Sequence, residues 1–211
     1  MNRWLSGSIV GAALVSLVVA GCAPAQPTED EEPVEEPIFD EIEEEEEHDH
    51  QADQGVLGLV GTAVMHTGEG EEMGEVIFTQ TEEGVLVEGL LESLEPGPKG
   101  FHVHEHGQCD PPDFESAGGH FNPEGHPHGG PDDPPGERHA GDFGNIEFDD
   151  DGAAEFSFVD DMITLGDGTN DVAGKALIVH YQEDDEETQP TGDAGPRAAC
   201  GIIEIIRSDV E

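Results

Sequence analysis

A series of short apolar runs, separated by Gly, Pro and Asp, limits the fold of this chain more than any other feature of its sequence. In several runs the side chains alternate between two faces with the two-residue period of a strand: Val85 and Val87 share one face, and Leu86 and Glu88 share the other. No amphipathic helical stretch of useful length accompanies them. The runs are Val56–Met65, Glu75–Thr81, Val85–Leu91, Gly100–Glu105, Asn145–Phe148, Ala153–Val159, Lys175–Tyr181 and Ala199–Ile206. Eight short strands predict an all-β fold, an antiparallel sandwich or barrel.

Two connections between the expected strands are long. They span Gly107–Gly144 and Gln182–Ala198. Loops of that length without secondary structure of their own are usually functional or disordered. We therefore look for the functional residues of the chain in and beside these two loops.

The N-terminus has the pattern of an export signal. Arg3 precedes an apolar run from Ile9 to Ala20, and small residues lead to Cys22. The Cys after Ala-Gly resembles the lipobox of bacterial-type lipoproteins, so we expect a signal peptide at 1–21 and a lipid on Cys22. An uncleaved anchor helix, or a free Cys after an ordinary signal, are the alternatives. In each case the rest of the chain is exported, and with the lipid it is anchored to the cell envelope, on a periplasmic or outer-surface side.

Residues 22–54 are rich in Pro, Glu and Asp and offer almost nothing to bury. Such composition predicts a disordered, self-repelling tether that holds a domain away from the membrane. His48 and His50 lie in this tether, and we interpret them as solvated residues outside any site. The folded domain is expected at residues 55–211.

The charge is extreme: 51 acidic residues stand against 6 basic ones, a formal net charge of −45. Nucleic-acid binding needs a basic footprint and is excluded by this composition. Residues 55–211 alone hold 36 acidic and 5 basic residues, which gives a net charge near −31. Such a domain is either simply very soluble or comes from a high-salt habitat, where screening relieves its self-repulsion. We favour the second interpretation.

Histidines form a constellation typical of a metal centre. His102 and His104 are two apart in an expected strand, so their rings share a face, and His180 ends another strand. The first long loop adds further candidates: His120, His126, His128, His139 and Asp142. Imidazole suits copper and zinc, and a carboxylate can complete a tetrahedral zinc site. A set free of cysteine and poor in oxygen argues against iron–sulfur clusters and calcium.

These residues carry a resemblance to a known family. The segments are Gly100-Phe101-His102-Val103-His104-Glu105, Ala117-Gly118-Gly119-His120-Phe121-Asn122-Pro123, His128-Gly129-Gly130-Pro131, Arg138-His139-Ala140-Gly141-Asp142-Phe143-Gly144-Asn145, Leu177-Ile178-Val179-His180 and Gly195-Pro196-Arg197-Ala198-Ala199-Cys200-Gly201. In order and spacing they closely resemble the copper/zinc superoxide dismutase family, over about Val56–Ile206. The resemblance implies an eight-stranded antiparallel Greek-key barrel with two long functional loops.

The resemblance also implies a ligand set. Copper would be held by His102, His104, His120 and His180. Zinc would be held by His120, His128, His139 and Asp142, so that His120 bridges the two metals. Asp184 would hydrogen-bond the remaining nitrogens of His102 and His128 and so orient both rings. His106 and His126 have no counterpart role.

The implied reaction converts superoxide to molecular oxygen and hydrogen peroxide, with His120 releasing and taking up a proton and Arg197 attracting the anion. Thr191 would line the other side of the substrate channel, and Cys109 and Cys200 would form a disulfide. One departure bears on steering: between Gln182 and Arg197 the loop is acidic and lacks any Lys or Arg. The alternatives are a copper- and zinc-binding envelope lipoprotein with incidental or no dismutase activity, and a mainly structural surface lipoprotein. The sequence leaves the oligomeric state open.

Overall fold

The computed structural model describes residues 58–206, which form nine strands and one short 3-10 helix. The expected signal peptide at 1–21, Cys22, the expected tether with His48 and His50, and Arg207 lie outside the described residues. No helix within residues 58–206 is long and apolar enough to cross a membrane. The elements are β1 Val60–Thr67, β2 Glu72–Thr81, β3 Gly84–Glu92, β4 Gly97–His104, η1 Glu115–Ala117, β5 Asp142–Phe148, β6 Ala153–Asp160, β7 Ala176–His180, β8 Arg197–Ile202 and β9 Glu204–Ile206.

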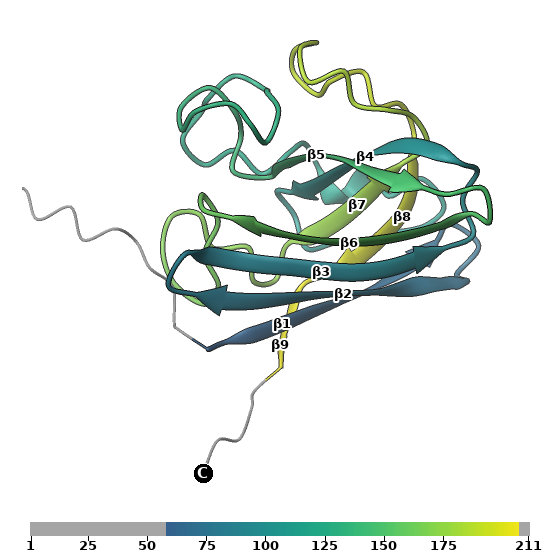
Figure 1. The fold of residues 1–211 in the computed structure, drawn as a ribbon, viewed down its shortest axis with the longest axis horizontal. Helices are drawn as coiled ribbons and strands as arrows, with labels where there is room; N and C mark the ends of the chain where they lie inside the picture. The colour runs from purple at the N-terminus through teal and green to yellow at the C-terminus, as the bar shows by residue number, and fades with distance from the viewer. Residues whose placement is uncertain (1–57, 207–211) are drawn as a thin grey trace, which may run out of the picture. The chain divides into compact units, whose positions relative to one another are not determined.

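The strands form one antiparallel sheet in the order β5-β4-β7-β8-β1-β2-β3-β6, and β9 pairs with β1. Because β3 pairs with β6 and β4 with β7, the chain crosses between two halves, as in a Greek key. Figure 1 shows β1, β2, β3 and β6 as one half and β4, β5, β7 and β8 as the other. The result is a nearly closed barrel, which confirms the expected all-β fold.

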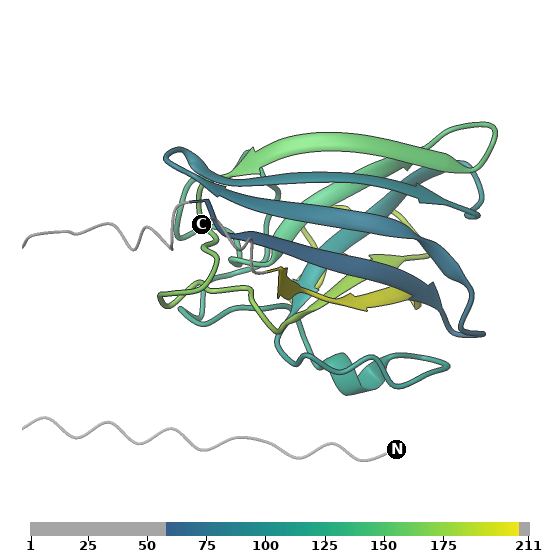
Figure 2. The same ribbon diagram turned by 90° about the horizontal axis from the view of Figure 1, so that it is seen from below.

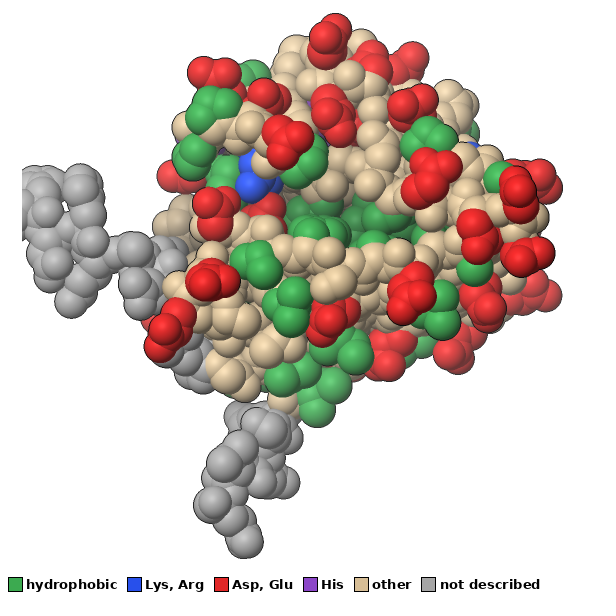
Figure 3. Space-filling view, viewed as in Figure 1, with side chains coloured by type: hydrophobic (Ala, Val, Ile, Leu, Met, Phe, Trp, Pro, Cys, Tyr) green, Lys and Arg blue, Asp and Glu red, His purple; other side chains and the backbone are tan. Residues whose placement is uncertain are grey.

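The barrel stays open between its terminal strands, β5 and β6, which the described ladders do not join. A cavity of about 700 Å³ lies along this seam, with Phe143, Phe156 and Phe158 among its lining residues. Figure 3 shows an apolar hollow in the middle of this face, surrounded by Asp and Glu side chains. Edge strands that face water in this way are commonly protected by charge.

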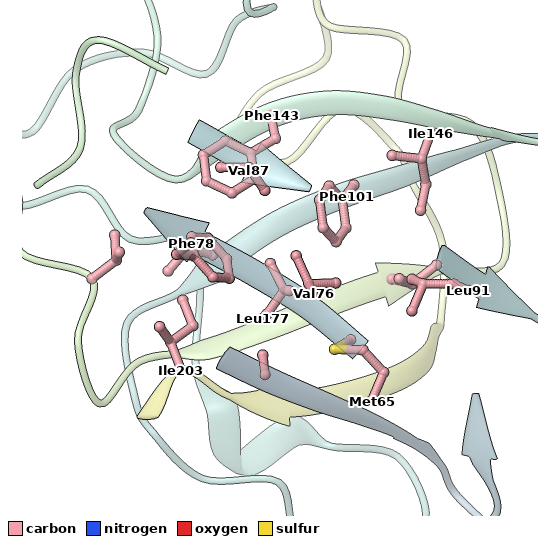
Figure 4. Packing of buried hydrophobic residues seen from close by; sticks show 14 of the residues in the cluster. Met65, Val76, Phe78, Val87, Leu91, Phe101, Phe143, Ile146, Leu177 and Ile203 are labelled. Carbon is pink, nitrogen blue, oxygen red and sulfur yellow. The ribbon is translucent and has the colours of Figure 1, made fainter. Parts of the chain in front are cut away.

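The core fills the space between the two halves. Side chains that alternate along each strand meet there, and Figure 4 shows Val76, Phe78, Phe101 and Leu177 pointing toward one another. Each of these four is fully buried, and burying such a side chain stabilises a fold by ~1.5–3 kcal/mol. Ile77, between Val76 and Phe78, faces outward and is 40% exposed. The alternation that predicted the strands therefore also fixes which face is buried.

The same alternation on β4 positions the histidines. Phe101 packs against the rings of Phe143 and Phe156 in the core, with centroids 5.7 and 5.2 Å away. His102 and His104 follow the opposite period, so they face away from this core and toward the loops. The β4–β5 loop, 105–141, and the β7–β8 loop, 181–196, cover that side, as Figures 1 and 2 show together.

Eight strands form the barrel ladder, as expected, but the last run is interrupted. This run, expected as one strand from Ala199 to Ile206, is split into β8 and β9 at Ile203. Ile203 is fully buried, and its N–H donates to the carbonyl of Lys175 at 2.9 Å, so the chain leaves the ladder there to fill the core. β5 also begins at Asp142, three residues before the expected start at Asn145. A ligand-type residue therefore lies inside a strand.

Candidate metal centre

Four histidines from three segments meet beside β4 and β7. His102 and His104 come from β4, and His180 is the last residue of β7, which pairs with β4. An isolated bridge between His104 and His120 brings the long loop against the strand. All four side chains are at most 6% exposed. Sequence positions 78 residues apart are thus joined by the β4–β7 ladder.

Each ring in this group has one nitrogen with a partner and one without. His104 Nδ1 bonds the carbonyl of Gly118 at 3.0 Å, and His180 Nδ1 bonds the carbonyl of Gly195 at 2.9 Å. The second ring nitrogen of each of the four histidines has no hydrogen-bond partner. These atoms are His102 Nδ1, His104 Nε2, His120 Nε2 and His180 Nε2. A buried polar atom left unpaired costs ~1–3 kcal/mol. Four such atoms within 4.8 Å of one another fit a metal that accepts nitrogen ligands, such as copper.

A second group surrounds Asp142. Its Oδ1 lies 2.8 Å from His120 Nδ1 and 3.1 Å from His139 Nδ1, and its Oδ2 lies 3.0 Å from His128 Nδ1. The Asp142 side chain and that of His128 are fully buried. Three imidazole nitrogens and one carboxylate within this range match the ligand set of a tetrahedral zinc site.

His120 belongs to both groups through opposite nitrogens. Its Nδ1 faces Asp142, while its Nε2 faces the unpaired nitrogens of the first group. Its ring centroid lies 4.0 Å from that of His102 and 5.6 Å from that of His139. One imidazole can therefore connect two metals.

Asp184, from the β7–β8 loop, ties the two groups together. It is 2% exposed, and its carboxylate accepts from His102 Nε2 at 2.5 Å and from His128 Nε2 at 3.0 Å. This is the contact pair that the resemblance implied. Hydrogen bonds of this kind fix the tautomer and orientation of metal-binding rings.

Burial and the neighbouring charges set the protonation of these groups. Burial, followed by the charge of His120, lowers the pKa of His102 to about 3. Burial also lowers the pKa of His180 to about 4 and that of His104 well below its usual value. Neutral imidazole is the form that binds metal, so this group is ready for it at neutral pH.

The second group behaves differently because carboxylates dominate it. Burial lowers the pKa of His128, but the nearby carboxylates of Asp142 and Asp184 outweigh it and raise that pKa to about 10. Burial raises the pKa of Asp142, yet the adjacent imidazoles of His120, His128 and His139 hold it well below the usual range. A metal that binds here must displace the proton of His128, so uptake releases a proton.

Arg197, the first residue of β8, lies beside the first group. Its Nη1 donates to the carbonyl of Phe114 and its Nη2 to that of Gly118, the same carbonyl that His104 Nδ1 bonds. The loop that carries these carbonyls is joined to β8 by the Cys109–Cys200 disulfide, as expected. Ring, loop and guanidinium are thus fixed relative to one another.

Three positioning residues were not singled out in the sequence. The side-chain amide of Asn145 accepts a hydrogen bond from the N–H of Asp184 at 2.8 Å and donates one to its carbonyl at 2.9 Å. Gln189 does the same for His128, with bonds of 2.8 and 2.7 Å. Arg138 donates to the carbonyl of Asp142 at 3.1 Å and to Asp160 at 2.9 Å. Only Arg138, beside His139, had a position in sequence that could have indicated such a role.

Three other residues stay apart from this network. Thr191 is partly buried, and its N–H donates to the carbonyl of Thr188. No described contact joins it to Arg197, so its place in a channel stays a prediction. His126 is bracketed by Asn122, and the exposed His106 lies 3.5 Å from Glu105. Neither lies in the two groups of potential metal ligands found among residues 58–206.

Comparison with known proteins agrees with this geometry. The sequence profile described as copper/zinc superoxide dismutase (SODC) matches residues 72–203. The chain belongs to the copper/zinc superoxide dismutase family. It is 44% identical over 150 residues to superoxide dismutase [Cu-Zn] 2 of Brassica juncea, covering 68% of this chain and 95% of the relative. It is 41% identical over 141 residues to superoxide dismutase [Cu-Zn] 1 of Aquifex aeolicus, covering 64% and 81%.

Solved structures of the family have the same fold. A SOD-like protein from Bacillus subtilis is 36% identical, with a TM-score of 0.62 over 66% of this chain and 95% of that one. The clock protein EA4 is 39% identical, with a TM-score of 0.64 over 72% and 98%. The chain is therefore an oxidoreductase of the copper/zinc superoxide dismutase class, with copper and zinc as its cofactors and superoxide as its substrate.

Proposed function

We propose that this chain dismutates superoxide outside the cytoplasm, anchored to the envelope by a lipid on Cys22. Copper would be held by His102, His104, His120 and His180, and zinc by His120, His128, His139 and Asp142. The observation that carries this assignment is His120, whose two ring nitrogens face the two groups. A mainly structural lipoprotein offers no reason for four unpaired nitrogens to converge.

Bound copper supplies one-electron chemistry: one superoxide is oxidised to O₂, and a second is reduced and takes up two protons to give H₂O₂. The protein's part is to position and to protonate. His120 Nδ1 faces the group formed by Asp142, His128 and His139, where zinc would be held, so a proton exchanged by this ring during turnover would be held at Nε2. Arg197 presents a fixed positive charge beside the same group, and Asp184 holds two of the rings.

Export and anchoring rest on the sequence before Cys22 and on the cysteine pairing. Two of the three cysteines form a disulfide between Cys109 and Cys200, which suits an oxidising compartment. The third, Cys22, directly follows the small residues of the expected signal peptide, which is the position where the lipid is expected. The acidic tether after it would hold the enzyme away from the membrane surface.

The assignment is tested with the full chain, loaded with both metals. We expect one copper and one zinc per chain by elemental analysis, and rapid superoxide removal by pulse radiolysis. Less than one equivalent of either metal would contradict the ligand assignment. Full metal content without turnover would favour a metal-binding lipoprotein, a candidate because one related structure is described only as SOD-like and another as a clock protein.

Anchoring is tested by mass spectrometry of envelope material. The mature protein should begin at a diacylated Cys22, and a Cys22→Ala variant should be released from the membrane. Cys109 and Cys200 should resist alkylation until a reductant is added. An intact Met1, or equal membrane retention of the variant, would contradict the lipid anchor.

A further inference from the structure

A small cavity beside Arg197 carries acidic side chains on its wall. Its volume is about 260 Å³, and it is lined by Asp113, Glu115, Gly195, Pro196 and Arg197. Arg197 is the one cation among these five residues, and both acids are exposed. An anion that approaches Arg197 through this cavity passes two side chains of its own sign.

The backbone fixes these carboxylates near the guanidinium. Phe114, between the two acids, gives its carbonyl to Arg197 Nη1, and its ring is buried against Ala117, Ile178 and Cys200. The N–H of Glu115 donates to Asp113 Oδ1 at 3.2 Å. The segment that holds Arg197 in place is therefore the segment that carries the two negative charges.

Neither acid forms a close pair with Arg197. Within residues 58–206 no ion pair of 4 Å or less joins Arg197 to a carboxylate, and both of its Nη atoms donate to carbonyls. Burial lowers the pKa of Arg197, while the charges of Glu115 and Asp113 act to raise it. The two carboxylates thus interact with the guanidinium by long-range electrostatics and not by a direct ion pair, and Arg197 still lines the cavity as a cation.

We propose that Asp113 and Glu115 control the access of superoxide to Arg197 and slow its capture in dilute salt. This inference rests on the proposed function, because it takes Arg197 as the local attraction for the substrate. Charges at a channel mouth change capture rates by ~10-fold or more, and the effect falls as salt shortens the Debye length from ~30 Å at 0.01 M to ~3 Å at 1 M. Removing both charges should raise kcat/KM roughly 3- to 10-fold at ~10 mM salt and less than about 2-fold at 1 M.

The test compares two neutralised pairs in the full, metal-loaded chain. Asp113→Asn with Glu115→Gln removes both charges at the cavity, and Asn keeps the oxygen that accepts from Glu115 N–H. Glu82→Gln with Glu83→Gln removes the same charge from the exposed β2–β3 turn, outside this cavity. Glu115→Gln alone serves as a second variant that leaves the Asp113 side chain untouched.

Two readouts are taken across the salt range. The first is kcat/KM for superoxide by pulse radiolysis, and the second is the dissociation constant of azide, a monoanion, from the absorption spectrum of the Cu(II) protein. We expect the cavity pair to raise kcat/KM and to tighten azide binding at low salt, both by more than the β2–β3 pair does. Both differences should shrink toward 1 M salt.

The outcomes separate the two hypotheses. Equal gains from both pairs would show a general charge effect and overturn a role for Asp113 and Glu115. The role of Asp113 and Glu115 would also be overturned if kcat/KM and azide binding were unchanged in both cavity variants while Arg197→Ala still slowed turnover. If the unmodified chain with full copper and zinc removed no superoxide, the proposed function itself would fail.

Discussion

At the scale of single residues, the position of Asp184 depends on a glycine opposite it. Gly192 has a φ of +65°, and a Cβ there would lie 1.7 Å from Asp184 Oδ1 and 2.6 Å from His128 Nε2. The substitution Gly192→Ala should therefore displace the carboxylate from both rings that it orients. Loss of such a partner typically weakens metal binding by ~10–100-fold. Competition with chelators of known affinity measures this for each metal.

Gly125 provides the matched control. It lies in the other long loop with a φ of +74°, and a Cβ there would meet nothing within 4 Å. Gly125→Ala thus introduces similar backbone strain without touching Asp184. Equal losses of metal affinity in the two variants would show that strain alone, rather than the displaced carboxylate, is responsible.

His120 and Arg197 should separate metal binding from turnover. His120→Ala removes a ligand from both groups, so we expect both metals to bind at least ~10-fold more weakly. Arg197→Ala removes a charge that touches only carbonyls, so both metals should stay while kcat/KM falls by roughly 10-fold or more. Loss of copper from the Arg197 variant, or an unchanged rate, would contradict its assigned role. Elemental analysis alongside pulse radiolysis decides this.

The buried rings also make the metal-free protein sensitive to acid. The pKa of His102 falls from 6.5 in the unfolded chain to about 3 in the fold, and that of His180 to about 4. Between pH 6.5 and 4 the unfolded chain therefore binds protons that the folded chain cannot, and stability falls with pH. The raised pKa of His128, about 10, adds stability that is lost only as pH rises toward that value. The lowered pKa of Asp142 contributes stability that is lost only as the pH falls below 3.8, the pKa of this group in the unfolded chain.

We expect the metal-free chain to lose on the order of 1–3 kcal/mol of unfolding free energy between pH 6.5 and 4.5. Denaturant titrations at several pH values measure this. His180→Gln should reduce the slope relative to the unmodified chain, because it removes a buried ring whose pKa is lowered. An equal slope in the two proteins would exclude His180 as a cause.

At the scale of elements, the β4–β5 loop is attached to β8 at two points. The disulfide joins Cys109 to Cys200 across 91 residues, and Arg197 bonds the carbonyls of Phe114 and Gly118. Cys109→Ala with Cys200→Ala should cost ~2–5 kcal/mol of unfolding free energy, by the entropy of the opened chain. It should also slow turnover with metals retained, because those carbonyls lose their support. Retained stability and full rate would contradict this coupling.

The elements that the sequence predicted best are those that bury one face. Alternation located β2, β3 and β6 to within a few residues, because the core selects every second side chain. Alternation could not show that Ile203 leaves the ladder or that Asp142 begins β5, because tertiary contacts decide both. The roles of Asn145 and Gln189 were hidden for the same reason. Each acts on backbone 39 or 61 residues away, which no local pattern records.

At the scale of the whole molecule, negative charge is spread over the barrel and its loops. Residues 58–206 hold 34 Asp and Glu against 4 Lys and Arg. Arg138 is buried against Asp160, so Lys99, Lys175 and the partly buried Arg197 are the remaining Lys and Arg side chains of the described surface. Figure 3 shows Asp and Glu side chains over most of one face. A domain of this kind is strained by its own repulsion in dilute salt.

Salt should therefore stabilise this protein. We expect the thermal midpoint of the metal-loaded chain to rise steeply with KCl up to ~0.5 M and then to level off, because the Debye length falls from ~30 Å at 0.01 M to ~3 Å at 1 M. Sucrose, which favours compact states by exclusion without screening charge, should give a gradual rise with no early step. Glu82→Gln with Glu83→Gln relieves part of the repulsion and should shrink the early step. Calorimetry at fixed metal content measures the KCl series, the sucrose series and the variant.

A midpoint that is flat or falls with KCl would mean that neighbouring carboxylates are already compensated in the fold, and the acidic surface would then be a matter of solubility alone. An early rise of the thermal midpoint followed by a plateau at molar KCl would fit the interpretation that this acidic chain comes from a high-salt habitat, because its self-repulsion would be screened there.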